Sequence, residues 1–423
     1  MITRPHTLDV AIAGFGTVGR AVARLLSERR HPVLHLRGIC TRRAAAARSE
    51  APWVPSGVCW TDDFETLLNT GAGVVVEVIG GVEPARTWID GALRAGRSVV
   101  TANKQVMAEH GPELVSLARA CGNPLRFEAA VGGAVPVIRG MQEGLAGDRL
   151  TGIFGVVNGT CNFVLSRMMR GGVSMADAVY EAQSRGLAEA DPGADLDGVD
   201  ARAKLAILAT IGFGDHLRPR DIPIESIRRI DAADASAAAS IGRVVRQVAW
   251  ACRSTEGEGR IDAGVGPALV CQGSWVARAQ GPENVVCVRG ERSGTTVFAG
   301  QGAGGDATAV AVVSDLLALL DGRSVPRPWP APSAGRTCAD FVARHYVRVL
   351  SADASGTHDA ADTLARAGVA IDRVLDQPGN GGRRWAAVVH PCSHRDLIMA
   401  LETLVPAADA ATSAVGLPLL DGD

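Results

Sequence analysis

The feature that most constrains the fold is an apolar strand that runs directly into a glycine-rich turn and a helix-forming segment. Residues 8–13 read LDVAIA, residues 14–19 read GFGTVG and residues 20–30 read RAVARLLSERR. A G-x-G-x-x-G turn in this context lets backbone N–H groups meet a pyrophosphate at a helix N-terminus, where the helix dipole favours negative charge. The sequence therefore predicts a dinucleotide-binding α/β fold, against the alternative of a glycine-rich turn without a ligand. The residues expected at this cofactor site are Gly14, Phe15, Gly16, Thr17, Val18 and Gly19.

The end of the second predicted strand bears on the choice of dinucleotide. Such folds often place Asp or Glu there to bind the ribose 2′-hydroxyl group. This chain has Arg42 and Arg43 instead. Because guanidinium groups suit a 2′-phosphate, we expect NADP to be preferred over NAD. Either arginine could equally be a solvated loop charge.

Further α/β units follow, with a strand at 73–81, a helix at 84–96 and a strand at 98–101 that leads into a helix beginning near Lys104. In parallel sheets, ligands bind at the carboxyl ends of the strands. The dipole of a helix disfavours a cation in its first turn, which favours a functional role for Lys104 over that of an exposed first-turn lysine.

The most acidic segment precedes an apolar helix. Residues 185–198 are interrupted by glycine and proline and are expected to form a loop, whereas the pattern from 199 to Gly212 predicts a largely buried helix. Asp200 and Lys204 stand four apart and therefore share a helix face. A partly desolvated lysine there would be a candidate general acid, and a solvent-exposed Asp–Lys pair is the alternative.

This segment resembles the signature of homoserine dehydrogenases, an acidic loop followed by a lysine four residues after the last aspartate. The matching residues are Gly186, Glu189, Asp191, Pro192, Asp195, Gly198, Asp200 and Lys204. T-A-N-K at 101–104 and N-G-T-x-N at 158–162 also resemble family motifs. The resemblance implies NAD(P)-dependent interconversion of L-aspartate 4-semialdehyde and L-homoserine, in the branch of the aspartate pathway that leads to threonine, methionine and isoleucine.

The resemblance also implies roles for individual residues. Lys204, Lys104 and Asp200 would be catalytic, and Glu189, Asp200, Asp195 and Lys104 would bind the substrate. Thr101, Lys104, Gly186 and Gly302 would join the cofactor site, although Asp306-Ala307-Thr308 replaces the usual Pro-Thr after Gly302. Glu128 with the carbonyl groups of Val131, Gly133 and Val135 would hold Na⁺ or K⁺. A buried, hydrogen-bonded glutamate at a tight turn is the alternative at Glu128. Cys161 is expected to be a small packed residue rather than a nucleophile.

The expected fold class is α/β, with a Rossmann-type domain, an α+β substrate and dimerisation domain, and a small ACT-like βαββαβ domain. The predicted boundaries are 1–129, completed by a returning helix within 300–325, then 130–299, a proline-rich linker at 326–340, and 341–423. The runs ALVCQ, SWVARA, NVVCVRG and TTVFAG suggest antiparallel strands.

The C-terminal segment resembles an ACT domain, which senses threonine in many bacterial homoserine dehydrogenases. The usual D-x-P-G loop is replaced by SADASGTHD, in which only Gly356 could be equivalent, so threonine as an effector stays open. His390, Cys392 and His394 could be read as metal ligands, but Pro391 breaks the regular spacing and no fourth ligand is evident. No kinase domain precedes the dehydrogenase, so we expect the single-activity form.

Composition excludes several classes of function. A formal net charge of −2 with 21% charged residues gives no basic footprint for nucleic acid or membranes. No secretory leader is evident, and nine cysteines without a C-x-x-C pair suggest reduced thiols in a cytoplasmic enzyme. By resemblance we expect a homodimer or homotetramer.

Two alternatives to the homoserine dehydrogenase function stay open. One is a diverged dehydrogenase acting on another amino aldehyde or hydroxy amino acid. The other is a non-catalytic nucleotide sensor, which would not need Glu189, Asp200, Lys104 and Lys204 together.

Overall fold

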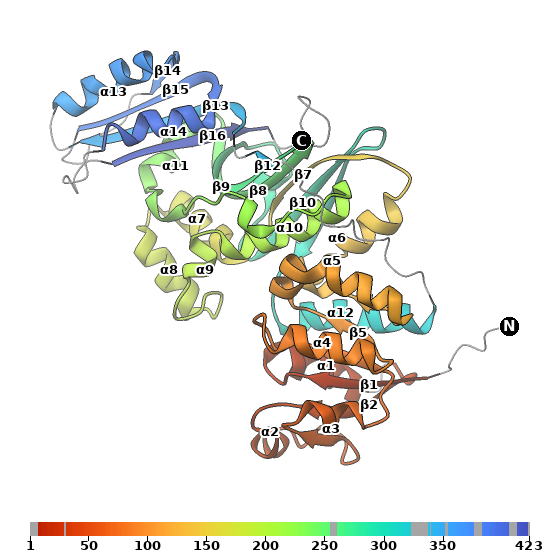
Figure 1. Ribbon diagram of the computed structural model, residues 1–423. Helices are drawn as coiled ribbons and strands as arrows, with labels where there is room; N and C mark the ends of the chain where they lie inside the picture. The colour runs from red at the N-terminus through yellow and green to blue at the C-terminus, as the bar shows by residue number, and fades with distance from the viewer. Residues whose placement is uncertain are drawn as a thin grey trace. The chain divides into compact units, whose positions relative to one another are not determined.

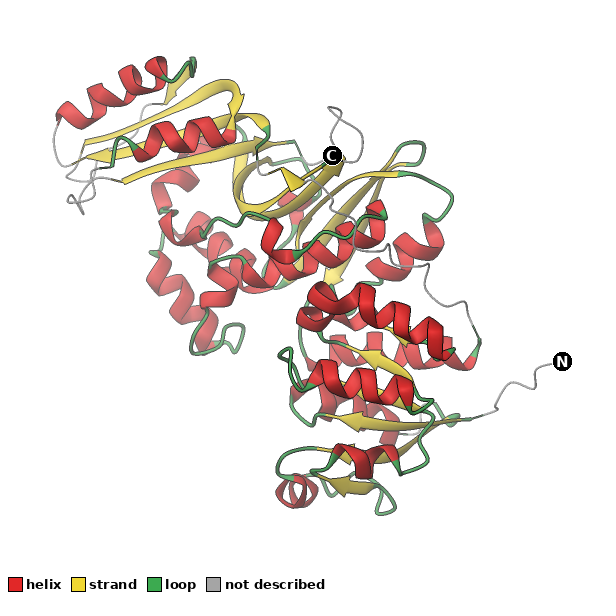
Figure 2. Ribbon diagram, viewed as in Figure 1, coloured by secondary structure: helices red, strands yellow, loops and turns green. Residues whose placement is uncertain are grey.

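The structure is a computed structural model. It describes residues 7–28, 31–253, 260–322, 337–338, 340–351, 354–375, 383–405 and 413–421. The chain divides into two compact units (Figures 1 and 2). Unit one comprises Met1–Thr151, Ala203–Arg220 and Val288–Gly335, and unit two comprises Gly152–Arg202, Asp221–Cys287 and Arg336–Asp423. In the described residues, no helix is long and apolar enough to cross a membrane.

Unit one is built on a parallel sheet of six strands in the order β3-β2-β1-β4-β5-β6. The central strands are short apolar runs that are buried on both faces, as expected for a parallel sheet covered by helices. The strand bounds are β1 (Leu8–Ala13), β2 (Leu34–Cys40), β3 (Cys59–Thr61), β4 (Val74–Glu77), β5 (Ser98–Thr101) and β6 (Leu125–Arg126).

Helices cover this sheet and return to it from the distant end of the sequence. Helix α12 (Gly305–Leu320) packs against α1 (Thr17–Ser27) so closely that a Cβ atom on Gly305 would lie 3.0 Å from Thr17 Cγ2. One apolar cluster joins the two helices to the sheet through Val22, Ile39 and Leu316. The remaining helices and turns of the unit are α2 (Ala44–Glu50), α3 (Phe64–Leu68), α4 (Ala85–Arg94), α5 (Lys104–Cys121), η1 (Glu128–Ala130), α6 (Val137–Arg139), the π-helical turn η2 (Gly140–Gly144) and η3 (Pro219–Asp221).

Unit two is organised around a mixed sheet in the order β10-β7-β8-β9-β16-β13-β15-β14, with β12 beside β9. The strands β8 and β9 form a long antiparallel pair, and β16 continues the sheet by pairing with β9 in parallel. The first group of bounds is β7 (Leu150–Val156), β8 (Arg243–Arg253), β9 (Ile261–Cys271), β10 (Glu283–Gly290) and β12 (Thr337–Cys338). Strand β11 (Gly294–Gln301) follows β10 after a short turn.

Helices pack against this sheet. Helix α7 (Gly159–Gly171) lies against α8 (Met175–Ser184), and α11 (Ala232–Ser240) lies against β8 and α7. Their apolar residues share one core with β16, for example Phe163, Val245 and Leu417. The other helical segments are α9 (Gly193–Leu196), α10 (Val199–Phe213), η4 (Ile227–Arg229) and η5 (Val276–Arg278).

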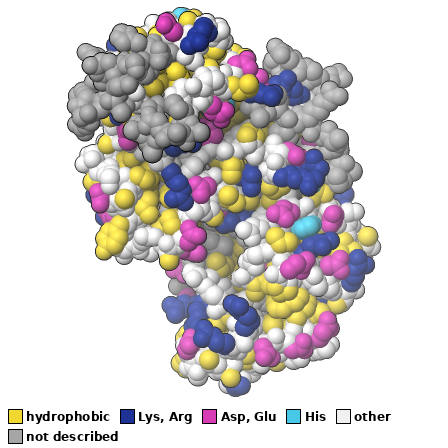
Figure 3. All heavy atoms as spheres, turned by 60° about the vertical axis from the view of Figure 1, so that its left-hand side comes forward, with side chains coloured by type: hydrophobic (Ala, Val, Ile, Leu, Met, Phe, Trp, Pro, Cys, Tyr) yellow, Lys and Arg dark blue, Asp and Glu magenta, His cyan; other side chains and the backbone are white. Residues whose placement is uncertain are grey.

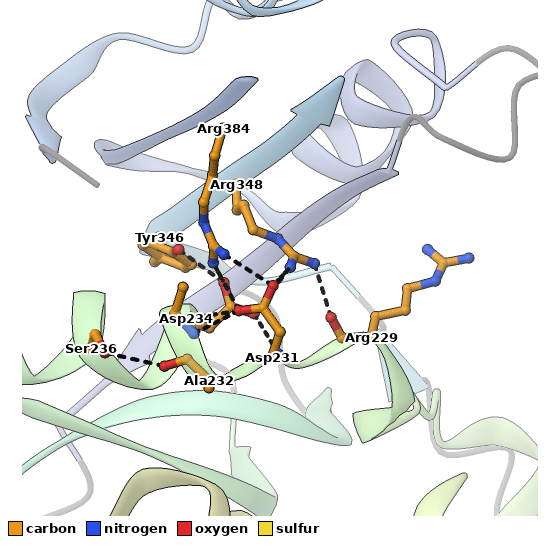
Figure 4. A network of polar contacts seen from close by, with 9 residues as sticks. Arg229, Asp231, Ala232, Asp234, Ser236, Tyr346, Arg348 and Arg384 are labelled. Carbon is orange, nitrogen blue, oxygen red and sulfur yellow. Dashed lines mark hydrogen bonds and ion pairs between the residues drawn. The ribbon is translucent and has the colours of Figure 1, made fainter. Parts of the chain in front are cut away.

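The C-terminal segment has the element order β-α-β-β-α-β. Its elements are β13 (Val342–Ser351), α13 (Ala354–Arg366), β14 (Ile371–Leu375), β15 (Arg383–Ser393), α14 (His394–Glu402) and β16 (Ser413–Leu420). It is joined to α11 by a polar cluster, which Figure 4 shows from close by. Asp231 and Asp234, which cap α11, accept hydrogen bonds from Arg348 of β13 and Arg384 of β15, and the Tyr346 hydroxyl group donates to Asp234.

The α/β fold class predicted from the sequence is confirmed, and the ACT assignment stays a prediction. The strand at 8–13, the strand at 98–101 and the helix from Val199 are confirmed as well. Strand β3 and helices α2 and α3 were not predicted, and the 185–198 loop contains the short helix α9. Of the predicted proline-rich linker at 326–340, residues 326–336 and 339 lie outside the described residues, and Thr337–Cys338 forms the short strand β12. Gly356 belongs to α13 rather than to a loop.

The strand predicted for SWVARA is wrong, because Val276–Arg278 forms the 3-10 turn η5. The Ser274 hydroxyl oxygen accepts the Ala277 N–H, and the Arg278 guanidinium lies 4.6 Å from the Trp275 ring. These contacts between residues three apart favour a turn over an extended chain.

Candidate active site

The glycine-rich turn has the geometry that a dinucleotide requires. Gly14 has φ +109°, and a Cβ atom there would lie 2.8 Å from the Val78 carbonyl oxygen. A Cβ atom on Gly19 would overlap the Gly14 carbonyl oxygen, so the first and third glycines allow the strand and α1 to pack. Gly16, the N-cap residue of α1, has no atom within 4 Å of an ideal Cβ position. The second glycine therefore leaves open space at a helix N-terminus, where a pyrophosphate would fit.

Aromatic side chains surround Phe15 of this turn. Its ring packs edge-on against Trp60 at 4.9 Å and lies parallel to Trp53 at 6.4 Å. Thr17 is exposed and Val18 is half-buried. Arg42 and Arg43, directly after β2, are both exposed. The two tryptophans were not singled out from the sequence, since no local motif marks them.

A buried polar group lies at the carboxyl ends of β4 and β5. The Glu77 side chain is 1% exposed and accepts hydrogen bonds from the Thr101 hydroxyl group at 2.5 Å and the Ile79 N–H at 2.9 Å. Burial raises the pKa of Glu77. Asn103 caps α5 through the Val106 N–H and donates to the Gly81 carbonyl, which fixes the start of the helix at Lys104. A lone glutamate inside the apolar run GVVVEVIGG is the signal that could have marked Glu77.

Glu128 lies in a cradle of backbone groups. Its two carboxylate oxygens accept the N–H groups of Ile138 at 2.9 Å and Arg139 at 2.8 Å, and its own N–H donates to Asp315. Burial, followed by the charge of Asp315, raises the pKa of Glu128 to about 7. Each carboxylate oxygen keeps a second lone pair, so a cation could still bind. Asp315 was not predicted as part of this site.

The turn that follows Glu128 meets the segment that contains Gly302. Gly133 has φ +58°, and a Cβ atom there would lie 2.8 Å from the Gln301 carbonyl oxygen. Val131, Val135 and Gly302 are buried. Two of the predicted site segments are therefore brought together in unit one, through contacts that only a glycine at 133 permits.

Lys104 and Lys204 are the only lysines in the sequence, and every other basic side chain that is permanently charged is an arginine. Lys204 is 8% exposed and Lys104 is half-buried. These two side chains carry amines, which can release a proton, whereas a guanidinium group does not. Figure 3 shows that basic side chains (Lys and Arg) and acidic side chains (Asp and Glu) are interspersed over the face in view.

In unit two, Asn158, Asp195 and Asp200 form one cluster. The Asn158 amide nitrogen donates to Asp195 Oδ1 at 2.7 Å and to Asp200 Oδ2 at 2.9 Å, and its oxygen accepts the Cys161 N–H at 2.8 Å. Asp200 is 8% exposed, and Asp195 is half-buried. A Cβ atom on Gly159 would lie 2.8 Å from the Pro282 carbonyl oxygen, which explains the N-G pair.

The other residues of the acidic loop are not part of this cluster. Asp197 binds Ser226 and Arg228, and Asp191 accepts the Gly193 N–H. Glu189 is exposed, and Gln183 holds its carbonyl oxygen at 3.1 Å. Gly186 has φ +69°, a conformation that favours glycine. Cys161 is buried and its thiol contacts the Asp195 carbonyl at 3.1 Å, as expected for a packed residue.

The described residues contain no group of three or more His, Cys, Asp or Glu side chains that could hold a metal ion. His390 faces Asp372 at 3.8 Å, whereas His394 binds Glu225 at 2.6 Å and lies 3.0 Å from the buried His345. The spacing of His390 and His394 in the sequence therefore does not bring them to one site.

Comparison with known proteins agrees with this geometry. The family model described as "Homoserine dehydrogenase, NAD binding domain" matches residues 14–128, and the model "Homoserine dehydrogenase" matches residues 136–317. The homoserine dehydrogenase of Mycobacterium bovis is 39% identical over 420 residues, which cover 95% of this chain and 94% of the relative. The nucleotide-binding fold and the matched segments define an NAD(P)-dependent oxidoreductase that acts on a CH–OH group.

Solved structures lead to the same class. A homoserine dehydrogenase from Thiobacillus denitrificans has a TM-score of 0.86 at 28% identity and covers 99% of both chains. A hyperthermophilic archaeal homoserine dehydrogenase in complex with NADPH has a TM-score of 0.65 at 28% identity and covers 76% of this chain and 100% of that one. The chain belongs to the homoserine dehydrogenase family, whose enzymes interconvert L-aspartate 4-semialdehyde and L-homoserine in amino-acid biosynthesis.

Proposed function

We propose that Lys204 is the group that exchanges a proton with the reacting oxygen. In the oxidative direction the hydroxyl group of homoserine loses its proton to the lysine amine, and C4 loses a hydride. A bound nicotinamide cofactor supplies the hydride chemistry. In the reverse direction, the lysine ammonium group donates a proton to the oxygen as it becomes an alkoxide. The observation that carries this proposal is the placement of Lys204 on α10, 8% exposed and one turn after the buried Asp200.

We infer that the remaining polar residues divide between substrate and cofactor. Lys104, at the start of α5, would assist the proton transfer or bind the substrate carboxylate. The substrate ammonium group would bind to Asp200, Asp195 and Glu189. Asp195 and Asp200 are held in one cluster by Asn158. The Gly14–Gly19 turn would bind the pyrophosphate, and Thr101, Gly186 and Gly302 would line the cofactor site.

The proposed cofactor is NADP, with NAD as the weaker alternative. Arg42 and Arg43 are exposed directly after β2, where a 2′-phosphate would lie. A double Arg→Ala variant should raise the Michaelis constant for NADP far more than that for NAD. Equal changes for both cofactors would contradict the assignment.

We also propose a Na⁺ or K⁺ site at Glu128 with the carbonyl groups of Val131, Gly133 and Val135. Hard cations prefer oxygen ligands, and a cation would offset the cost of burying this carboxylate.

Assembly as a homodimer or homotetramer is a further proposal, which light scattering of the purified protein would test. Whether threonine acts as an effector is testable by titrating it into the assay.

The decisive experiment compares Lys204→Ala with Lys204→Arg. Both variants should keep NADPH binding and lose about 10²- to 10⁴-fold in kcat, because arginine supplies charge but does not release a proton. Since the chain has two lysines, protein carrying ¹³C-labelled lysine gives two side-chain signals, and Lys204 can be assigned from the variant and titrated directly. Near-normal turnover in Lys204→Arg would show that charge alone suffices and would refute the proton-transfer role.

A further inference from the structure

The Asn158 side chain makes more hydrogen bonds than its role as a helix cap requires. As the N-cap residue of α7, it needs only its side-chain oxygen, which accepts the Cys161 N–H at 2.8 Å. Its amide nitrogen has two hydrogens, and each is donated to a different carboxylate, Asp195 at 2.7 Å and Asp200 at 2.9 Å. The side chain therefore uses all three of these interactions at once.

The direction of this amide is fixed by its partners. Reversing the group would place its oxygen against two carboxylates and its NH₂ group against a backbone N–H, so all three contacts would become repulsive. Asn158 is 4% exposed, and water cannot readily replace these partners. Asn158 is consequently a rigid donor that faces both carboxylates.

The loop that carries Asp195 is held from a second direction. Its backbone carbonyl accepts hydrogen bonds from the Cys161 thiol at 3.1 Å and from Gln247 of β8 at 3.2 Å. The start of α7 and the strand β8 therefore fix the main chain of Asp195, and Asn158 fixes its carboxylate. In the described part of the chain, Asn158 is the only side chain that hydrogen-bonds the Asp195 carboxylate.

The chemistry of the bridging group matters as much as its position. Two carboxylates that approach one nitrogen this closely repel each other, and a donor to each of them offsets part of that repulsion. An arginine would hold the pair together but would neutralise it, whereas an amide satisfies both carboxylates through dipolar donors without adding charge.

We propose that Asn158 is a positioning residue for the dehydrogenase reaction. It holds the carboxylates of Asp195 and Asp200 beside each other through its two N–H groups, so that together they receive the ammonium group of the amino-acid substrate. This inference rests on the proposed function, in which these two aspartates bind the substrate. Through these two carboxylates, Asn158 would contribute to the preference of the enzyme for an amino-acid substrate over a hydroxy acid that lacks the ammonium group.

The test uses two variants that keep the helix cap. Aspartate and serine are both good N-cap residues, so Asn158→Asp and Asn158→Ser retain an acceptor for the Cys161 N–H. Asn158→Asp replaces the NH₂ group that donates to both carboxylates by one oxygen atom, and Asn158→Ser is the milder variant if the first folds poorly. Ser174→Ala, which removes the cap of the neighbouring helix α8, is the control for loss of a cap alone.

We expect both Asn158 variants to raise the Michaelis constant for L-homoserine about 10- to 100-fold, the effect of losing a hydrogen bond to a charged group. The dissociation constant of NADPH should stay within twofold of the wild type, and kcat should fall less than the Michaelis constant rises. Ser174→Ala should lower the melting temperature without this kinetic pattern.

Two further variants separate the possible failures. If Asp195→Asn and Asp200→Asn raise the Michaelis constant while both Asn158 variants behave as wild type, Asn158 is a cap only and the inference is wrong. If the two aspartate variants also leave the Michaelis constant unchanged, the proposed substrate site itself is wrong.

Discussion

Unit two contains two pairs of aspartates that are held in opposite ways. Asp195 and Asp200 share the neutral amide of Asn158, whereas Asp231 and Asp234 are bound by the guanidinium groups of Arg348 and Arg384. Both pairs lie at the beginning of helices, so sequence position alone does not distinguish them. The difference lies in the bridging group, which is a neutral amide in one pair and two guanidinium groups in the other.

The arginine-bound pair stabilises the fold. Asp234 and Arg348 are 0% and 2% exposed, and Figure 4 shows the two guanidinium groups converging on both carboxylates. Burial opposes ionisation of Asp231, but the hydrogen bond from Arg384 and the charge of Arg348 bring its pKa below the usual range. The charge of this pair is thus used within the protein, to attach β13 and β15 to α11. For the amide-bound pair we propose a different role, which is to receive the ammonium group of the substrate.

The largest expected effect is on stability, at the arginine-bound pair. Arg384→Met should destabilise the protein by about 3 kcal/mol or more, because removing one partner leaves the buried Asp234 carboxylate poorly compensated. The measurement is the urea midpoint of the full-length protein, together with kcat and the Michaelis constant for L-homoserine at 25 °C, which should change less than twofold.

Arg344→Met is the matched control for this prediction. Arg344 lies on β13, the strand that pairs with β15, and forms an ion pair with Asp372, but the two side chains are 48% and 32% exposed. Exposed pairs contribute about 1 kcal/mol or less. Equal destabilisation by both variants would show that burial of the Asp231–Asp234 cluster carries no special weight.

The amide-bound pair should show the reverse pattern. Asp195→Asn should raise the Michaelis constant for L-homoserine about 10- to 100-fold, since a charge that faces the substrate is lost, and should shift the urea midpoint little. Asp197→Asn is the control, because Asp197 lies in the same loop but is bound to Ser226 and Arg228. A kinetic defect in Asp197→Asn as large as that in Asp195→Asn would mean that the loop acts through its total charge.

Glu128 is a buried carboxylate of a third kind, because backbone N–H groups rather than an amide side chain or arginines bind it. Its pKa of about 7 lies above the ordinary value of 4.5, so between pH 4.5 and 7 the unfolded chain releases this proton before the folded chain does. The free energy of unfolding therefore falls as pH rises through this window, because the folded protein must bury an ionised Glu128. Above pH 7 the full cost of burying this charge is present. A cation bound there should remove part of that cost.

We therefore predict that replacing NaCl or KCl by choline chloride at equal ionic strength lowers stability at pH 8 by about 1 kcal/mol, the effect of a ligand at several times its dissociation constant. The melting temperature should hardly respond at pH 5. Glu128→Gln should abolish the dependence on the cation at both pH values. A cation effect that is equal at pH 5 and pH 8, or that persists in Glu128→Gln, would place the ion elsewhere.

The parts of the molecule that depend on local pattern could be predicted from the sequence. The strand at 8–13, the glycine turn and the helix from Val199 follow from periodicity and turn chemistry, and the lysine restriction to positions 104 and 204 is visible in the sequence itself. The η5 turn could not be predicted from periodicity, because Ser274 and Trp275 make contacts that override a strand-like pattern.

Partnerships across long sequence separations could not be predicted. Nothing local indicates that Asn158 binds residues 195 and 200, that Asp231 binds Arg348 and Arg384, or that Asp315 faces Glu128. The acidic loop illustrates the limit: its pattern marked four carboxylates, but only the fold separates Asp195, which joins the Asn158 cluster, from Asp197, which binds Arg228.

The smallest expected effect tests how each pair responds to the loss of a single donor. Tyr346→Phe removes the hydroxyl group that donates to Asp234 Oδ1 at 2.9 Å, but Arg384 still donates to the same oxygen at 2.8 Å. Because the acceptor stays satisfied, the loss should be about 1 kcal/mol in the free energy of unfolding, with unchanged kinetics. At the amide-bound pair, by contrast, Asn158→Ser removes the one side-chain donor to the Asp195 carboxylate among the described residues, and the Michaelis constant should respond strongly. If Tyr346→Phe instead destabilised the protein as much as Arg384→Met, the arginines would not be the groups that hold the Asp231–Asp234 pair, and the contrast between the two pairs would fail.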